Sequence, residues 1–232
     1  MMILAMESSA KPASVAVCCD GALLGQYFQN SGLTHSRTLL SMAESLLNNL
    51  GISISDIELV AVASGPGSFT GVRIGVSAAK GLAWGMNKPI CGVSTLAAIA
   101  YQTPETGLII CPVMDARRGQ VYNALFEWRN GSLARLCDDR AISLEDLADG
   151  LRRFESPCLL VGDGAAVSYR FLSAAGELCR LTPMLMRYQT AYGVALAAEH
   201  TEPIPAIELE PGYLRLPQAA RERLYQTSPT ET

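Results

Sequence analysis

The sequence predicts an α/β fold built from two related lobes, of which the second is reduced. Each half of the 232-residue chain opens with short strand-like segments and continues with alternating helical and extended patterns. A polar turn at 103–107, which contains proline and glycine, separates the halves. We therefore expect a first lobe at 1–102 and a second lobe at 103–232. A return of the C-terminal segment to the first lobe is left open.

The first lobe begins with three predicted strands, at 3–6, 13–19 and 22–29. The last two are joined by Asp20-Gly21, a strong signal for a two-residue hairpin. A polar turn follows the first strand and starts with Glu7. A carboxylate there could hold a metal, orient a phosphate or simply cap the turn, and the turn cap is the commonest of these.

A helix is predicted from Thr34 to Leu50, with Thr34 or Ser36 as its cap and Gly51 as its end. Its apolar residues recur at helical spacing and most of them belong to a core stripe. They extend beyond one face, which is a modest indication of a partner. The stripe consists of Leu39, Leu40, Ala43, Leu46, Leu47 and Leu50.

A glycine-rich loop at 65–75 organises the first lobe, because an apolar strand at 58–64 precedes it and a helix at 70–87 follows it. Backbone N–H groups at such a turn can bind phosphate, and the helix N-terminus adds partial positive charge. The loop matches neither the Walker A nor the dinucleotide pattern. A tight turn without a ligand is therefore an equal alternative. The residues expected at a weak phosphate or nucleotide site are Ser8, Ser9, Gly65, Gly67, Ser68 and Thr70.

The helix after this loop carries small residues every fourth position, so they share one face. Each glycine inside a helix costs roughly 1 kcal/mol relative to alanine, and a close neighbour must compensate. That neighbour is either the sheet of this lobe or a helix of a partner chain. The residues are Gly71, Gly75, Ala79 and Ala83, with Gly81 and Gly85 as two further glycines.

The remaining pattern completes both lobes. A strand at 89–93 and a helix at 95–101 end the first lobe. The second lobe has predicted strands at 108–114, 120–128, 132–137 and 158–161, and helices at 143–153, 165–176 and 190–200. Two lobes with the same layout are the arrangement of the actin and Hsp70-type ATPases, an RNase H-like fold. In that fold, turns such as 7–11, 65–71 and 115–119 hold a nucleotide between the lobes. The small second lobe argues against a complete nucleotide cleft here.

Composition excludes several functions. The net charge is −4, so the chain lacks the basic surface of an autonomous nucleic-acid binder. Seven irregularly spaced cysteines without a CxxC pair indicate reduced thiols in a cytoplasmic protein and no zinc site. The apolar start is interrupted at Glu7, too early for a membrane span or a secretion signal.

Five segments resemble the bacterial TsaB (YeaZ) family: 3–9, 65–75, 92–96, 115–122 and 213–215. They occur in order over nearly the whole chain, and the glycine segment is very specific. The resemblance implies a role in making threonylcarbamoyladenosine on tRNA. Members are similar to the catalytic subunit TsaD but are thought not to catalyse. They pair with TsaD through helices of the first lobe, and the ATPase TsaE joins the pair. Many relatives have Asp where this chain has Glu7, so a metal role for that position is further in doubt.

The resemblance also implies where partners bind. TsaD and TsaE are the expected protein partners, tRNA is contacted only through the complex, and the isolated chain could form a homodimer. No cofactor is required by this chain, and ATP or ADP is expected to bind weakly or at the complex interface. Arg73 and Arg117 are expected to make ion pairs or to contact a partner. The expected partner-binding residues are Ser36, Leu39, Leu40, Ala43, Leu47, Gly71, Gly75, Ala78, Ala79 and Leu82.

The residues support a non-catalytic role without a metal. The catalytic relative holds its metal with paired histidines, whereas this chain has only His35 and His200. Leu39 lies one helical turn after His35, so no His-x-x-x-His pair exists. Two alternatives remain: a weak ATPase or ATP-dependent phosphotransferase of the same fold, and a metallopeptidase. The latter lacks the H-E-x-x-H motif.

Overall fold

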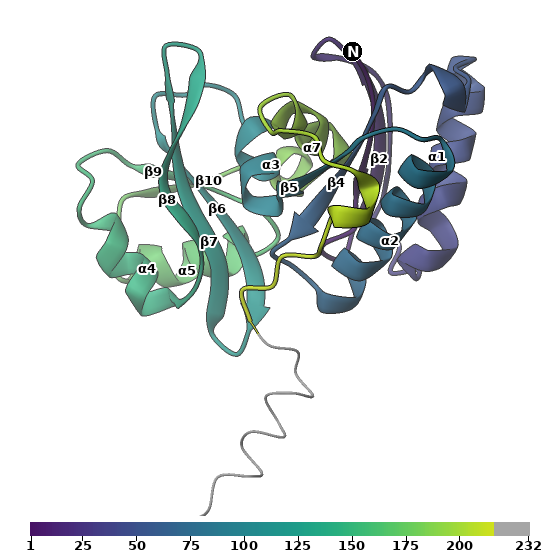
Figure 1. The fold of residues 1–232 in the computed structure, drawn as a ribbon. Coiled ribbons are helices and arrows are strands. Elements are labelled where there is room, and N and C mark those ends of the chain that lie inside the picture. Colours follow the sequence, from purple (N-terminus) through teal and green to yellow (C-terminus); the bar gives the residue numbers. More distant parts are fainter. Residues whose placement is uncertain (216–232) are drawn as a thin grey trace, which may run out of the picture.

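A computed structural model describes residues 1–215, which form two lobes side by side, each built around a five-stranded sheet (Figure 1). The first sheet has the order β3-β2-β1-β4-β5, and the second has the order β10-β9-β6-β7-β8. When the strands are numbered within their own lobe and the second sheet is read from β8 to β10, both sheets have the order third, second, first, fourth, fifth. This repetition confirms the predicted fold of two related lobes. Residues 216–232 of the predicted second lobe lie outside the described residues.

The first sheet combines a hairpin meander with parallel strands. β1 pairs antiparallel with β2 and parallel with β4. Asp20 and Gly21 have φ values of 49° and 77°, as a tight hairpin turn requires, so the predicted hairpin is confirmed. The strands are β1 (Met2–Glu7), β2 (Ala13–Cys19), β3 (Ala22–Gln29), β4 (Leu59–Gly65) and β5 (Ile90–Ser94).

Helices cover both faces of the first sheet. The side chains of alternate strand residues form two apolar clusters, one with α1 and α2 and the other with α3 and α7. α7 comes late in the sequence but packs on this first sheet. Gly51 ends α1 in a left-handed conformation, as predicted. The helices are α1 (His35–Leu50), α2 (Phe69–Gly85), α3 (Thr95–Tyr101) and α7 (Ala191–Ala198), with short 3₁₀ turns η1 (Ile54–Asp56) and η2 (Ala206–Glu208).

Helices of the second lobe cover one face of its sheet, and a helix of the first lobe covers the other. α4 and α5 pack on one side of its sheet, while the other side packs on α3 of the first lobe. Ile99 of α3 and Phe126 of the second sheet belong to this shared cluster, which joins the lobes. The elements are β6 (Ile109–Arg117), β7 (Gln120–Arg129), β8 (Ser132–Ser143), α4 (Leu144–Leu151), β9 (Cys158–Val161), α5 (Ala165–Ala174), β10 (Cys179–Leu181) and α6 (Met184–Arg187).

Two details differ from the sequence prediction. The strand expected at 132–137 continues to Ser143, because β8 stays paired with β7 along its length, up to Gln120 opposite Ser143. β10 and α6 were not predicted. No helix of the described chain is both long and apolar enough to cross a bilayer.

Candidate functional site

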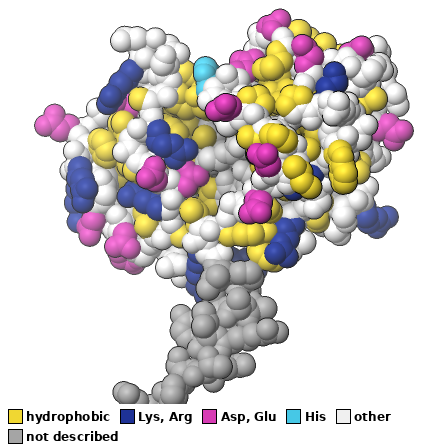
Figure 2. All heavy atoms as spheres, viewed as in Figure 1, with side chains coloured by type: hydrophobic (Ala, Val, Ile, Leu, Met, Phe, Trp, Pro, Cys, Tyr) yellow, Lys and Arg dark blue, Asp and Glu magenta, His cyan; other side chains and the backbone are white. Residues whose placement is uncertain are grey.

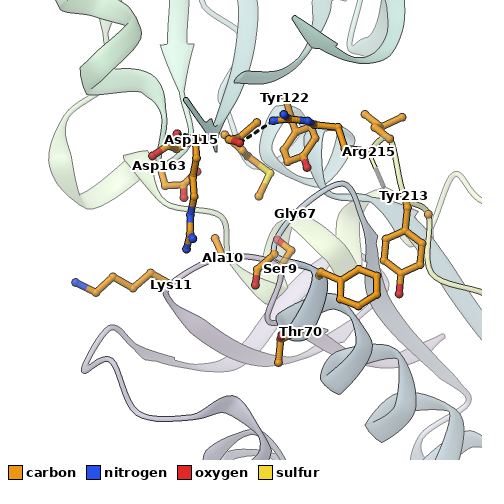
Figure 3. Close-up of a pocket in the computed structure, with 17 residues that line it drawn as sticks. Ser9, Ala10, Lys11, Gly67, Thr70, Asp115, Tyr122, Asp163, Tyr213 and Arg215 are labelled. Atoms are coloured by element: carbon orange, nitrogen blue, oxygen red, sulfur yellow. Dashed lines mark hydrogen bonds between the residues drawn. The ribbon is translucent and has the colours of Figure 1, made fainter. Parts of the chain in front are cut away.

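A cleft of about 780 Å³ opens between the two lobes (Figure 3). Its walls come from the β1–β2 turn and the β4–α2 loop of the first lobe, and from the ends of β6 and β9 in the second. The C-terminal segment forms a further wall. The lining residues used below are Ser9, Lys11, Gly67, Ser68, Thr70, Asp115, Arg117, Asp163, Gly212, Tyr213 and Arg215.

In the first-lobe wall of the cleft, the β1–β2 turn packs directly against the β4–α2 loop. Glu7 accepts a hydrogen bond from Ser9 N through Oε1 at 2.6 Å, so it caps the turn, which is the simplest of the roles left open. Ser68 N donates to Ser9 O at 2.6 Å. A side chain at Gly67 would lie 2.4 Å from Ser9 O, so the two turns touch without space for a Cβ. The N–H of Ser68 is therefore used inside the protein, and Ser68 Oγ caps α2 by accepting a hydrogen bond from Gly71 N.

The second-lobe wall repeats part of this geometry. Gly162, at the end of β9, has φ +107°, and Gly65, at the end of β4, has φ +126°. Asp163 follows Gly162 and lines the cleft. Its Oδ1 atom is buried and has no hydrogen-bond partner among the described residues. Asp115 lies near the end of β6 and accepts a hydrogen bond from Arg117 N through Oδ1 at 2.7 Å.

Two carboxyl groups, one from each lobe, have pKa values that are raised above their usual range. Burial raises the pKa of Glu7 to about 7, and the nearby Asp163 contributes to this increase. Burial also raises the pKa of Asp163 to about 6, with a further contribution from the charge of Asp115. The region where the lobes meet therefore disfavours a second anion. Lys11 and Arg117 are exposed basic residues of the cleft lining, and Figure 3 shows Lys11 extending away from Ser9 and Gly67.

These residues fit a tightly bound nucleotide poorly. The Ser68 N–H donates to Ser9 O, and Ser8 Oγ donates to Gly71 O at 2.9 Å, so neither faces the cleft as a free donor. Ser9 Oγ is buried and lacks a partner among the described residues, and Thr70 lines the cleft. In residues 1–215, no group of three or more His, Cys, Asp or Glu side chains is placed to hold a metal ion. Weak nucleotide binding stays a prediction.

The small-residue face of α2 is buried inside this chain. A Cβ at Gly71 would lie 2.2 Å from Ser8 O, and one at Gly75 would lie 2.4 Å from Ser8 Oγ. Ala79 and Ala83 are fully buried. Of the two neighbours considered from the sequence, the chain's own first lobe therefore packs on this face, and Gly71, Gly75 and Ala79 are not available to a partner in this conformation.

Some of the other expected partner-binding residues are buried and some are exposed. Leu39, Ala43 and Leu47 of α1 are buried in the core. Ser36 and Leu40 are exposed, and Ala78 and Leu82 are half-buried next to α1. Contact of these residues with a partner stays a prediction.

The outward face of α2 has a feature that the sequence analysis did not assign. Gly81 and Gly85 lie there, and nothing in the described chain comes within 4 Å of a Cβ built on either residue. Ile74 and Ser77 share this face at helical spacing. The helix thus carries two glycines that no contact within residues 1–215 explains.

Arg73 and the two histidines contact other residues of this chain. Arg73 stacks on Phe69, 3.8 Å from the ring centroid, and its Nε donates to the Tyr213 hydroxyl at 2.7 Å. His35 Nε2 lies 2.8 Å from Ala10 O. His200 stacks on Tyr101 with ring centroids 5.0 Å apart. Within residues 1–215, neither Arg73 nor Arg117 forms the expected ion pair.

Sequence reasoning missed Asp163 and the C-terminal residues as cleft residues. A signal for Asp163 was present, because Gly162-Asp163-Gly164 follows β9 as the glycine loop follows β4. Tyr213 and Arg215 were noted only as part of a family motif. Their contacts lie about a hundred residues or more away in the chain, and no local pattern predicts such pairs.

Comparison with known proteins identifies the family. The family model for TsaD, tRNA N6-adenosine threonylcarbamoyltransferase, matches residues 29–207. The tRNA threonylcarbamoyladenosine biosynthesis protein TsaB of Bacillus subtilis (strain 168) is 31% identical over 220 residues, which cover 94% of this chain and 96% of the relative. The structure of YeaZ from Pseudomonas aeruginosa is 25% identical, covers 92% of this chain and 99% of its own, and superposes with a TM-score of 0.79.

A more distant structure supports the fold alone. Component A of the (R)-2-hydroxyglutaryl-CoA dehydratase of Acidaminococcus fermentans superposes with a TM-score of 0.51 at 12% identity, over 86% of this chain and 98% of its own. The predicted actin-like, two-lobed fold is confirmed by this likeness together with the repeated sheets. The chain belongs to the TsaB family, within the wider family that the TsaD model describes.

Proposed function

We propose that this chain is a non-catalytic partner subunit for the formation of N6-threonylcarbamoyladenosine on tRNA. In this proposal it binds and activates TsaD, acts together with the ATPase TsaE, and contacts tRNA only through the complex. The biosynthetic role of the named relatives supports the reaction. The net charge of −4 supports the limited contact with tRNA, because phosphate contacts provide most non-specific affinity.

The outward face of α2 is the observation that carries the partner role. Glycine inside an exposed helix costs roughly 1 kcal/mol relative to alanine. Gly81 bears this cost with no contact in the described chain to compensate, and Gly85, the last residue of α2, is equally open. Small residues on a helix let another helix approach closely. We place the partner on this outward face, together with Ala78 and Leu82 and the exposed Leu40 of the adjacent α1.

The non-catalytic role is supported by the two histidines. His35 begins α1, whereas His200 follows α7 and stacks on Tyr101. Each has a structural neighbour of its own, and they lie on different elements. TsaD therefore brings the metal and the acceptor site, and this chain stabilises the active arrangement of TsaD.

Reconstitution tests the proposal. A mixture of TsaD, TsaE, tRNA and the activated threonylcarbamoyl donor is expected to lose modified nucleoside when this chain is omitted and to recover it on add-back. Arg117→Ala is expected to restore activity as the wild type does, because the proposal assigns Arg117 no chemical role. Full modification without the chain would disprove the requirement. Loss of activity in Arg117→Ala with the complex intact would assign the second lobe a direct part.

A second candidate, weak nucleotide binding in the interlobe cleft, is favoured by one observation. Ser9 Oγ and Asp163 Oδ1 are buried polar atoms at the cleft that lack partners among the described residues. Such atoms are normally satisfied by water or a ligand. We propose that ATP or ADP binds there weakly, without turnover, and is not required by this chain alone.

A further inference from the structure

Residues 204–215, here called the C-terminal strap, run from the first lobe to the second. In Figure 1 this segment follows α7 and descends between the lobes after η2, and its last four residues, 212–215, line the cleft. We propose that the C-terminal strap is an interlobe clasp, which holds the two lobes at a fixed angle and makes them move as one body. This inference does not depend on the proposed function.

The strap is first fastened to the open edge of the first sheet. Ile204 and Ile90 of β5 exchange both backbone hydrogen bonds, at 2.9 and 3.0 Å. Lys80 of α2 then donates to the carbonyl oxygens of Ile207 and Leu209, at 3.1 and 2.8 Å. These contacts cover β5, which would otherwise present unpaired backbone groups.

One side chain of the strap is an apolar anchor. Leu209 is 5% exposed and packs into the cluster under α2. Its Cδ1 would lie 2.3 Å from a Cβ built on Gly92, so Leu209 occupies the space that the absence of a side chain at Gly92 provides. The glycine at position 92 thus has a physical explanation in the strap.

The strap next packs on the organising glycine loop. Gly212 N donates to Ser64 O at 2.7 Å. A Cβ at Gly65 would lie 2.2 Å from Gly212 O, so only glycine permits this approach. The Tyr213 ring lies 4.8 Å from that of Phe69, and its hydroxyl accepts from Arg73. The aromatic pair and the arginine hold the strap on the start of α2.

The last described residue reaches the second lobe. Arg215 Nη1 donates to Ala116 O, near the end of β6, at 2.8 Å (Figure 3, dashed line). Charged donors form stronger hydrogen bonds than neutral ones. Within residues 1–215, this is the strap's one hydrogen bond to the second lobe. Tyr213 is fixed on the first lobe two residues earlier, so the strap links the two lobes through these contacts and adds to the apolar cluster that joins them.

Hydrogen exchange followed by mass spectrometry tests the clasp on the full chain. We compare the wild type with Tyr213→Ala/Arg215→Ala at the strap and with Arg170→Ala as a control. Arg170 is an exposed arginine of α5 for which the described residues show no hydrogen bond. Losing the charged hydrogen bond is expected to speed exchange about tenfold. We expect this both in the glycine loop, 64–71, and in the second-lobe turn, 113–122, with the control unchanged.

Two results would overturn the proposal. Exchange that speeds up in 64–71 but not in 113–122 would show that the strap belongs to the first lobe alone. Exchange that changes in neither segment would show that the strap does not hold the two lobes together. If the double variant exchanges rapidly throughout because it unfolds, Arg215→Ala decides by the same two segments, since it removes one hydrogen bond at the edge of the structure.

Discussion

The two faces of α2 carry glycines for different reasons. On the inner face, Gly71 and Gly75 lie against Ser8, where a Cβ would meet another atom at 2.2 to 2.4 Å. On the outer face, Gly81 and Gly85 touch nothing in the described chain. The inner glycines are explained by the fold of this chain, and we propose a partner as the neighbour of the outer ones.

We therefore expect the inner face to determine the stability of this chain and the outer face to determine its binding to a partner. Substitutions on the inner face should unfold or loosen the first lobe, because they act on the joint between α2 and the Glu7–Ser9 turn. Substitutions on the outer face should leave the fold intact and change only what binds to it. Each prediction below tests one side of this division.

The largest expected effect concerns pH and the inner joint. The folded pKa of Glu7 is about 7, against a usual 4.5, so the folded state keeps a proton that the unfolded chain releases between these values. The free energy of unfolding therefore falls as pH rises across this window, by about 3 kcal/mol for Glu7. Asp163, with a pKa of about 6, acts in the same direction.

Glu7→Gln should flatten this dependence, because Gln cannot ionise. Denaturant unfolding at several pH values from 4.5 to 8 measures the slopes of both proteins. Equal slopes in the wild type and the variant would mean that Glu7 does not hold a proton in the folded state.

Gly71→Ala tests the packing of the inner face. The added Cβ would lie 2.2 Å from the backbone oxygen of Ser8, which cannot move away as a side chain could. Overpacking of this kind costs about 2 kcal/mol. Thermal and urea unfolding should show the loss. A variant as stable as the wild type would place Gly71 in open space and remove the basis of the comparison.

Gly81→Ala is the matched substitution on the outer face. Alanine lowers the conformational freedom of the unfolded chain and meets no atom within 4 Å, so stability should rise by up to about 1 kcal/mol. The same unfolding measurements apply. A loss of stability would indicate an internal contact at Gly81.

The smallest expected effect is nucleotide binding to the isolated chain. The N–H of Ser68 donates to Ser9, and Glu7 and Asp163 occupy the region where the lobes meet. Calorimetry with ATP and Mg²⁺ should give affinity weaker than micromolar and no hydrolysis. Micromolar binding, with hydrolysis lost in Glu7→Ala, would favour the kinase-like alternative.

The sequence was sufficient for the parts of the fold that depend on local chemistry. Asp20-Gly21 formed its hairpin, Gly51 ended α1, and the repeated layout produced two lobes with one strand order. Each of these follows from a few neighbouring residues or from periodicity.

The remaining features depend on distant contacts. β10 has three residues and exists through its pairing with β9, so its local pattern was too short to predict it. The two faces of α2 could not be distinguished either. Glycine has no side chain to place in a hydrophobic pattern, and the residue that packs on Gly71, Ser8, lies 63 positions away. The role of Tyr213 in the strap was hidden for the same reason.

The most direct test of the account measures the affinity of the full chain for TsaD from the same organism. Gly81→Arg places a long side chain on the outer face and should weaken binding at least tenfold, about 1.4 kcal/mol, with unfolding unchanged. Val167→Arg, which adds the same side chain to an exposed position on α5, should bind as the wild type does. Wild-type affinity in Gly81→Arg would contradict the assignment of this face to the partner.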